Sequence, residues 1–201
     1  MNYFVTGIDT DSGKTLVSAI LCEALGFDYW KPIQAGMPRD ADTVKELAPT
    51  TVIHPEAYFL KTPASPHASA KLDNIKIELD KIHLPDTPGK LIIEGAGGCL
   101  VPLNDQDFVI DLASKFGAEI ILVANLYLGS INHTLLTINL LNSRNYPVKG
   151  IIFNGRSNPE SERIILLHSK YKRLLHIDQE SAITPETVTR YAKQLKENWN
   201  D

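Results

Sequence analysis

The chain has 201 residues, of which 43% are hydrophobic and 22% are charged, with a formal net charge of −4. These values are typical of one soluble globular domain, residues 1–201, and exclude a fibrous or disordered chain. The negative charge gives no reason to expect nucleic acid as a partner. No stretch resembles a signal peptide or a membrane span, so we expect no membrane partner and a cytoplasmic protein. The two cysteines lack metal-ligand spacing and are expected to be reduced.

Short apolar runs alternate with longer amphipathic stretches, a pattern typical of parallel strands buried between helices. In chain order, we predict a strand at Tyr3–Val5, a helix at Lys14–Leu25, a strand at Tyr29–Ile33, a helix at Ala41–Leu47, a strand at Leu91–Ile93, a helix at Phe108–Phe116, a strand at Ile120–Ala124, a helix at Ile131–Asn142, a strand at Val148–Phe153, and helices at Pro159–Tyr171 and Pro185–Asn198. The strand at Tyr29–Ile33 is the weakest, because Pro32 cannot donate to a central ladder.

This alternation predicts an α/β fold in which a doubly wound, mostly parallel sheet is flanked by helices. Residues 51–88 are rich in proline and harder to interpret, and we expect an excursion from the sheet that carries part of a site. Residues 175–201 are expected to form a short, helical C-terminal tail.

The segment Gly7–Thr15 runs from a glycine to Gly-Lys-Thr, between an apolar strand and a helix, which is the context of a P-loop. Backbone N–H groups and the helix N-terminus would bind phosphate oxygens. Lys14 would neutralise the β- and γ-phosphates, and the Thr15 hydroxyl would bind Mg²⁺. The alternative is an ordinary glycine turn. The predicted nucleotide-binding residues here are Thr10, Asp11, Ser12, Gly13, Lys14, Thr15 and Leu16.

A P-loop protein needs an acidic residue at a nearby strand end to hold Mg²⁺. Glu94 ends an apolar strand and runs into Gly95, Ala96 and Gly97, where backbone amides can approach a ligand closely. The alternative is a solvated glutamate before a flexible turn. Asp42, early in a predicted helix, is the second candidate, and spacing alone does not select it over Asp40.

Five motifs in order make the chain similar to the dethiobiotin synthetase family over about residues 2 to 155. They are Thr6–Thr15, Lys31-Pro-Ile-Gln-Ala-Gly36, Ser65-Pro-His-Ala68, Glu94–Gly98 with Val101-Pro-Leu103, and Leu128-Gly-Ser-Ile-Asn-His-Thr134. The resemblance implies a homodimeric, ATP- and Mg²⁺-dependent enzyme that acts on 7,8-diaminopelargonate and CO₂ or bicarbonate. A carbamate formed on one amine attacks the γ-phosphate of ATP, and the second amine then closes the urea ring and expels phosphate.

The resemblance also implies roles for single residues. Lys31, which its sequence context alone leaves open as a solvated lysine, matches the catalytic lysine beside Lys14. Thr15, Asp42 and Glu94 match the Mg²⁺ ligands, and Asn154 matches the base-reading asparagine. The nucleotide is further expected to contact Asp42 and Glu94–Gly97. Substrate is expected to contact Ala35, Gly97 and, from the neighbouring subunit, Gly129, Ser130, Ile131 and Asn132.

Three features depart from the family pattern. Ala35 replaces a common serine or threonine, and Asp11-Ser12 replaces the commoner Glu-Val. After Leu175 we find no Ile-Pro base-binding segment, which leaves base selectivity open. Two rivals stay open. One is a partition-type or scaffold ATPase that acts as a dimerising switch, and the other, motivated by Ala35 and the short tail, is a nucleotide-binding module without ligase activity.

Overall fold

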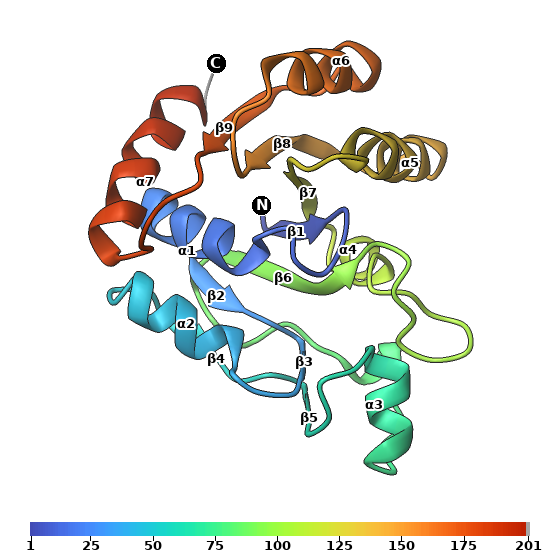
Figure 1. The fold of residues 1–201 in the computed structure, drawn as a ribbon. Coiled ribbons are helices and arrows are strands. Elements are labelled where there is room, and N and C mark those ends of the chain that lie inside the picture. Colours follow the sequence, from blue (N-terminus) through green and yellow to red (C-terminus); the bar gives the residue numbers. More distant parts are fainter. Residues whose placement is uncertain (200–201) are drawn as a thin grey trace.

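Strands and helices alternate along the computed structural model, which describes residues 1–199 (Figure 1). The elements are β1 (Tyr3–Gly7), α1 (Lys14–Leu25), β2 (Asp28–Trp30), β3 (Ile33–Ala35), α2 (Asp40–Leu47), β4 (Ile53–His54), β5 (Tyr58–Leu60), α3 (Pro66–Leu72), the 3₁₀ helix η1 (Leu79–Lys81), β6 (Leu91–Gly98), α4 (Asp111–Lys115), β7 (Glu119–Asn125), α5 (Ser130–Ser143), β8 (Val148–Asn154), α6 (Pro159–Ser169), β9 (Arg173–Ile177) and α7 (Pro185–Trp199). Among residues 1–199, no helix has the length and apolar character needed to cross a membrane.

The main sheet has seven strands in the order β4-β2-β6-β1-β7-β8-β9, and neighbouring strands pair in parallel. The chain starts in the middle at β1, forms β2 and β4 on one side, returns to β6 beside β1, and then winds outward through β7, β8 and β9 on the other side. This order confirms the predicted doubly wound fold. Ligands bind such sheets at the carboxyl ends of the strands, where the winding direction changes. Here that place is the end of β1, between β6 and β7.

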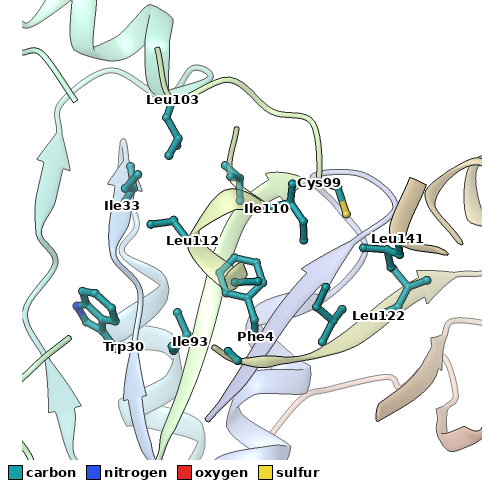
Figure 2. Close-up of a cluster of buried hydrophobic side chains, with 14 of the residues drawn as sticks. Phe4, Trp30, Ile33, Ile93, Cys99, Leu103, Ile110, Leu112, Leu122 and Leu141 are labelled. Atoms are coloured by element: carbon teal, nitrogen blue, oxygen red, sulfur yellow. The ribbon is translucent and has the colours of Figure 1, made fainter. Parts of the chain in front are cut away.

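Successive strand residues point to opposite sides of the sheet. Because consecutive residues of the central strands are apolar, both faces of the sheet are apolar. Phe4, Ile93 and Leu122 pack in one cluster, which Figure 2 shows, together with side chains of α4 and α5. Their neighbours Val5 and Ile121 pack in the other cluster, with α1 and α7. Burying a side chain of this size stabilises the fold by about 1.5–3 kcal/mol. The two layers therefore hold the strand ends, and the loops on them, in fixed positions.

The predicted strand Tyr29–Ile33 is in fact two strands in two different sheets. β2 joins the main sheet, whereas β3 pairs with β5 in a separate two-stranded sheet. Pro32 lies between them and lacks the N–H that a continuous ladder would need. Lys31, the residue before Pro32, therefore lies just beyond the carboxyl end of β2, at the edge of the main sheet where ligands bind.

Other boundaries also differ from the prediction. The expected helix Phe108–Phe116 is α-helical only in α4, and Phe108–Asp111 form a hydrogen-bonded turn in which Asp111 Oδ2 accepts from the backbone N–H of Phe108. Residues 51–88 are not wholly an excursion, since β4 joins the edge of the main sheet. The expected tail 175–201 begins inside β9, a strand that the sequence analysis does not predict, and residues 200 and 201 lie outside the described residues.

Candidate active site

The loop between β1 and α1 is held in shape by its own side chains. Five residues separate Gly7 from Gly13, one more than in the common Gly-x-x-x-x-Gly-Lys-Thr pattern. The Ser12 hydroxyl donates to Asp9 Oδ1 at 2.6 Å and accepts from the Asp9 N–H at 3.0 Å, which closes the longer loop. Gly13 has a φ of 91°, a left-handed conformation that favours glycine.

Lys14 is buried at the N-terminus of α1 and folds back over this loop. Its Nζ donates to the carbonyl oxygens of Asp9 at 2.9 Å and Thr10 at 3.0 Å. Burial lowers the pKa of Lys14, although the negative charge of Glu94 opposes the shift. A poorly solvated ammonium beside a helix N-terminus favours the binding of a phosphate anion.

Glu94, in β6, is the buried centre of the polar site. Its Oε1 accepts from the Thr15 hydroxyl at 3.0 Å and from Lys31 Nζ at 3.2 Å, and its Oε2 accepts from the Tyr29 hydroxyl at 3.0 Å. Burial raises the pKa of Tyr29, and the charge of Glu94 raises it further. Through these hydrogen bonds Glu94 connects β6 to the start of α1 and to β2 and the residue that follows it.

Lys31 pairs with two carboxylates, Glu94 and Asp40. Burial by itself lowers the pKa of Lys31, but the charges of Glu94 and Asp40 outweigh burial, so the pKa lies above its ordinary value. The lysine is therefore a permanently charged group at neutral pH, and not the solvated side chain that its local sequence left open.

The sequence prediction of Asp42 as the acid of α2 is not supported by the geometry. The side chain of Asp42 is 62% exposed and faces Arg39 at 3.6 Å, whereas Asp40 contacts Lys31 and lines the site. Residues two positions apart point about 200° apart around a helix, so both cannot face one site. In the structure Asp40, and not Asp42, lies at the cavity.

These groups line a cavity of about 810 Å³ at the carboxyl ends of the strands. It contains ten of the predicted residues: Thr10, Asp11, Gly13, Lys14, Thr15, Lys31, Ala35, Glu94, Ala96 and Gly97. The lining also contains Gln34, Ser65, Pro66 and Val101, which only the family motifs marked, and Asp40, the alternative to Asp42. The sequence did not indicate the remaining lining residues, which are Met37, Pro38, Pro63 and Ala64. They lie in the turn after β3 and in the segment 51–88, which the sequence predicted to carry part of a site without indicating these residues.

Four predicted residues near the loop do not line this cavity. Ser12 is buried inside the loop, and Leu16 packs against the core on the side of α1. A Cβ atom at Gly95 would lie 3.0 Å from the side chain of Val109, so this glycine serves close packing. Asn154, at the end of β8, donates from Nδ2 to the Ser12 carbonyl at 3.0 Å. Asn154 thus lies against the outer side of the P-loop.

The segment Gly129–Asn132 at the start of α5 does not line the cavity either. The Ser130 hydroxyl accepts from the N–H of Tyr127 at 3.3 Å, outside its own helix. The Tyr127 hydroxyl donates to Asp9 Oδ2 at 3.3 Å and lies 2.5 Å from His133 Nδ1. These contacts connect the beginning of α5 to the P-loop, while Leu128 next to it is fully exposed.

A parallel sheet with a phosphate-binding loop after its first strand defines the chain as a P-loop ATPase by class. The AAA domain family matches residues 1–187. The septum site-determining protein MinD of Pyrococcus horikoshii, complexed with Mg-ADP, superposes with a TM-score of 0.61 at 15% identity, covering 100% of this chain and 97% of that one. A ParA family ATPase of Chlorobium tepidum gives 0.58 at 16% identity, covering 98% and 95%. At such identities only the fold is shared.

Sequence relatives narrow the class further. An ATP-dependent dethiobiotin synthetase BioD of Cytophaga hutchinsonii is 61% identical over 201 residues, covering 98% of both chains. The protein of the same name from Christiangramia forsetii is 46% identical over 199 residues, covering 97% of this chain and 96% of its own. The chain belongs to the ATP-dependent dethiobiotin synthetase family. The relationship covers nearly the whole length, and it favours a ligase over the switch ATPase and the inactive module.

Proposed function

We propose that the chain is an ATP-dependent cyclo-ligase of biotin biosynthesis, which forms dethiobiotin from 7,8-diaminopelargonate and CO₂ and releases ADP and phosphate. The observation that carries this proposal is the meeting of Lys31 and Glu94 beside the P-loop in one cavity. A second lysine so close to the phosphate loop has a use in transferring a phosphoryl group to an anionic acceptor.

Nucleotide would bind with its phosphates over the loop from Thr10 to Thr15. The backbone N–H groups and Lys14 would neutralise phosphate oxygens, and their rigid placement means that little reorganisation is needed. Asn154, whose Nδ2 donates to the Ser12 carbonyl, would lie near a base attached to these phosphates. The remaining predicted contacts, at Leu16 and Gly95, would act through packing.

The oxygen donors at the site fit Mg²⁺, which prefers carboxylate, hydroxyl and phosphate oxygens. Thr15, Asp40 and Glu94 would hold the ion. Among residues 1–199 no cluster of three or more His, Cys, Asp or Glu could bind a metal alone, so phosphate oxygens and water would complete the shell. When bound, the ion would neutralise charge on the transferring phosphoryl group.

Lys31 would stabilise the charge on the carbamate and on the phosphoryl group as they approach each other. Asp40 and Glu94 hold its ammonium group in place, so its position does not depend on the substrate. Once the carbamate oxygen has been phosphorylated, the second amine attacks the carbonyl carbon and phosphate leaves. The protein mainly orients groups and supplies positive charge, as in other phosphoryl transfers.

The diamine would lie between Lys31 and the wall formed by Ala35 and Pro63–Ser65, which line the same cavity. Its distant carboxylate would be bound by a partner subunit, at the N–H groups of Gly129–Asn132. The exposed Leu128 and Leu136 beside this segment favour a homodimer whose interface lies near the site. The need for ATP and the two free, buried cysteines favour the cytoplasm.

The test is to incubate the purified protein with diaminopelargonate, bicarbonate, Mg²⁺ and ATP, and to seek the cyclic urea by mass spectrometry. Omission of any one component should abolish the product. ATP hydrolysis that continues without the diamine, and without urea formation, would contradict the ligase and favour the switch ATPase. For the dimer, light scattering should give twice the chain mass, and Leu128→Asp should reduce it.

A further inference from the structure

Gln34, in β3, has a buried side chain whose hydrogen bonds all go to the turn that follows. Its Nε2 donates to the carbonyl oxygen of Gly36 at 3.1 Å and to that of Pro38 at 3.4 Å. Its Oε1 accepts from the N–H of Asp40 at 3.3 Å. One side chain therefore binds the turn at its beginning, its middle and its end. A buried amide is expected to be satisfied in this way, but nothing requires that all its partners lie in one segment.

The same turn is held from outside at two further places. Gly36 has a φ of 78°, and a Cβ atom there would lie within 2.9 Å of three atoms of Pro63, so the turn touches the loop after β5. Arg39, the residue before α2, donates to both carboxylate oxygens of Glu56, at 3.0 Å and 2.9 Å. These contacts fix the outer side of the turn, and Gln34 fixes its inner side, toward the cavity that it also lines.

The turn ends at Asp40, whose position depends on it. Asp40 is the first residue of α2, so the hydrogen bond to Gln34 binds one of the free N–H groups of this helix. The carboxylate of the same residue contacts Lys31 and faces the cavity. A shift of the Asp40 backbone would move the carboxylate with it, because only two side-chain bonds join the carboxylate carbon to the Cα atom.

We propose that Gln34 is a positioning residue, which holds the turn so that the Asp40 carboxylate reaches both Lys31 and the metal site. This inference rests on the proposed role of Asp40 in binding the metal ion. Groups that orient a metal ligand through a hydrogen bond commonly change metal affinity by about 10- to 100-fold when removed. Gln34→Met keeps the length of the side chain and removes all three hydrogen bonds.

The test uses Mn²⁺ as a paramagnetic probe of the metal site in the whole protein with ADP. In Gln34→Met, electron paramagnetic resonance should show Mn²⁺ binding weakened about tenfold, while ADP binding in EDTA, measured by calorimetry, stays unchanged. Gln106→Met, at an exposed position, is the matched control and should leave both unchanged. Should Gln34→Met fail to fold, Gln34→Glu keeps the length and the acceptor for Asp40 but loses both donors, and the same weakening is expected.

A double variant separates positioning from general stability. If Gln34 acts through Asp40, then Gln34→Met should not weaken Mn²⁺ binding further in an Asp40→Asn background. Multiplied losses in the double variant, or unchanged Mn²⁺ binding in Gln34→Met, would overturn the inference. Unchanged binding in Asp40→Asn alone would instead overturn the metal role of Asp40, and the inference with it. Urea formation by the wild type is assayed separately and shows whether the reaction itself stands.

Discussion

Lys31 Nζ lies 3.2 Å from Glu94 Oε1, and both side chains are buried. A buried ion pair stabilises a fold little by itself, because desolvation offsets the attraction, but removal of one partner leaves an uncompensated charge. The pair is therefore better explained by chemistry at the cavity than by stability. This relationship underlies the first prediction.

Lys31→Met should lower kcat for urea formation by about 10²- to 10³-fold, the loss typical of a group that stabilises transition-state charge. Nucleotide affinity should change little, since Lys14 and the loop amides bind the phosphates. Steady-state assays and calorimetry measure the two effects. Lys76→Met, whose lysine is largely exposed, serves as the control. Wild-type turnover in Lys31→Met would remove this residue from the mechanism.

Lys14→Ala should weaken ATP binding about 10- to 100-fold, because a hydrogen bond to a charged group contributes about 1.5–3 kcal/mol. Its Nζ bonds to the carbonyl oxygens of Asp9 and Thr10 would also be lost, so the fold of the variant should be checked by circular dichroism. Calorimetric titration with ATP measures the affinity. An unchanged dissociation constant in a folded variant would count against the phosphate-binding role of this loop.

Asp40→Asn and Asp42→Asn form a matched pair that separates the structure from the sequence prediction. Asp40→Asn should raise the Mg²⁺ concentration needed for half-maximal activity by at least about tenfold. Asp42→Asn should change it by less than about twofold, because exposed ion pairs contribute little. The measurement is a Mg²⁺ titration of urea formation. The reverse order of effects would restore Asp42 as the ligand.

Tyr29→Phe removes the buried hydroxyl that donates to Glu94 Oε2. We expect the free energy of unfolding to fall by about 1.5–3 kcal/mol, the range for hydrogen bonds to charged groups. Equilibrium unfolding with urea as the denaturant measures this change. Tyr146→Phe, whose hydroxyl lies 3.5 Å from Asp111, is the control and should lose less. Equal losses in the two variants would mean that Tyr29 has no special interaction with the carboxylate.

The two lysines of the site should titrate on opposite sides of the ordinary lysine pKa of 10.5, with Lys14 below it and Lys31 above it. The charge of Lys31 thus stabilises the fold below about pH 10.5, and this stabilisation is lost as the pH rises through the raised pKa. Burial disfavours the charged form of Lys14, so its charge lowers the stability of the fold below its reduced pKa, and this loss is relieved as the pH rises toward 10.5. NMR titration of ¹⁵N-labelled lysine Nζ groups, assigned with the Lys14→Ala and Lys31→Met variants, measures both values. An inverted order would contradict the charge arrangement described for the site.

Local sequence was sufficient to predict a doubly wound parallel sheet and the P-loop, but not the order of the strands. β1, β6, β7 and β8 are apolar on both faces, and this pattern depends only on burial between two helical layers. Lys14 and Thr15 begin the helix after β1, and Glu94 follows the apolar residues Leu91–Ile93 within β6, so their meeting near one edge of the sheet follows from parallel pairing. Lys31 needed the family resemblance, because a lysine after a short strand has no distinctive pattern.

The choice of Asp40 over Asp42, and the involvement of Gln34, depended on tertiary structure. Both aspartates suit the first turn of a helix, and the contacts of the turn after β3 with Gln34, Pro63 and Glu56 accompany the arrangement in which Asp40 faces Lys31. The two-residue strand β4 is likewise formed by pairing with β2 at the edge of the sheet, which its own short sequence does not indicate. Side-chain direction at a helix start and the pairing of short strands depend on contacts distant in the chain, which no local spacing encodes.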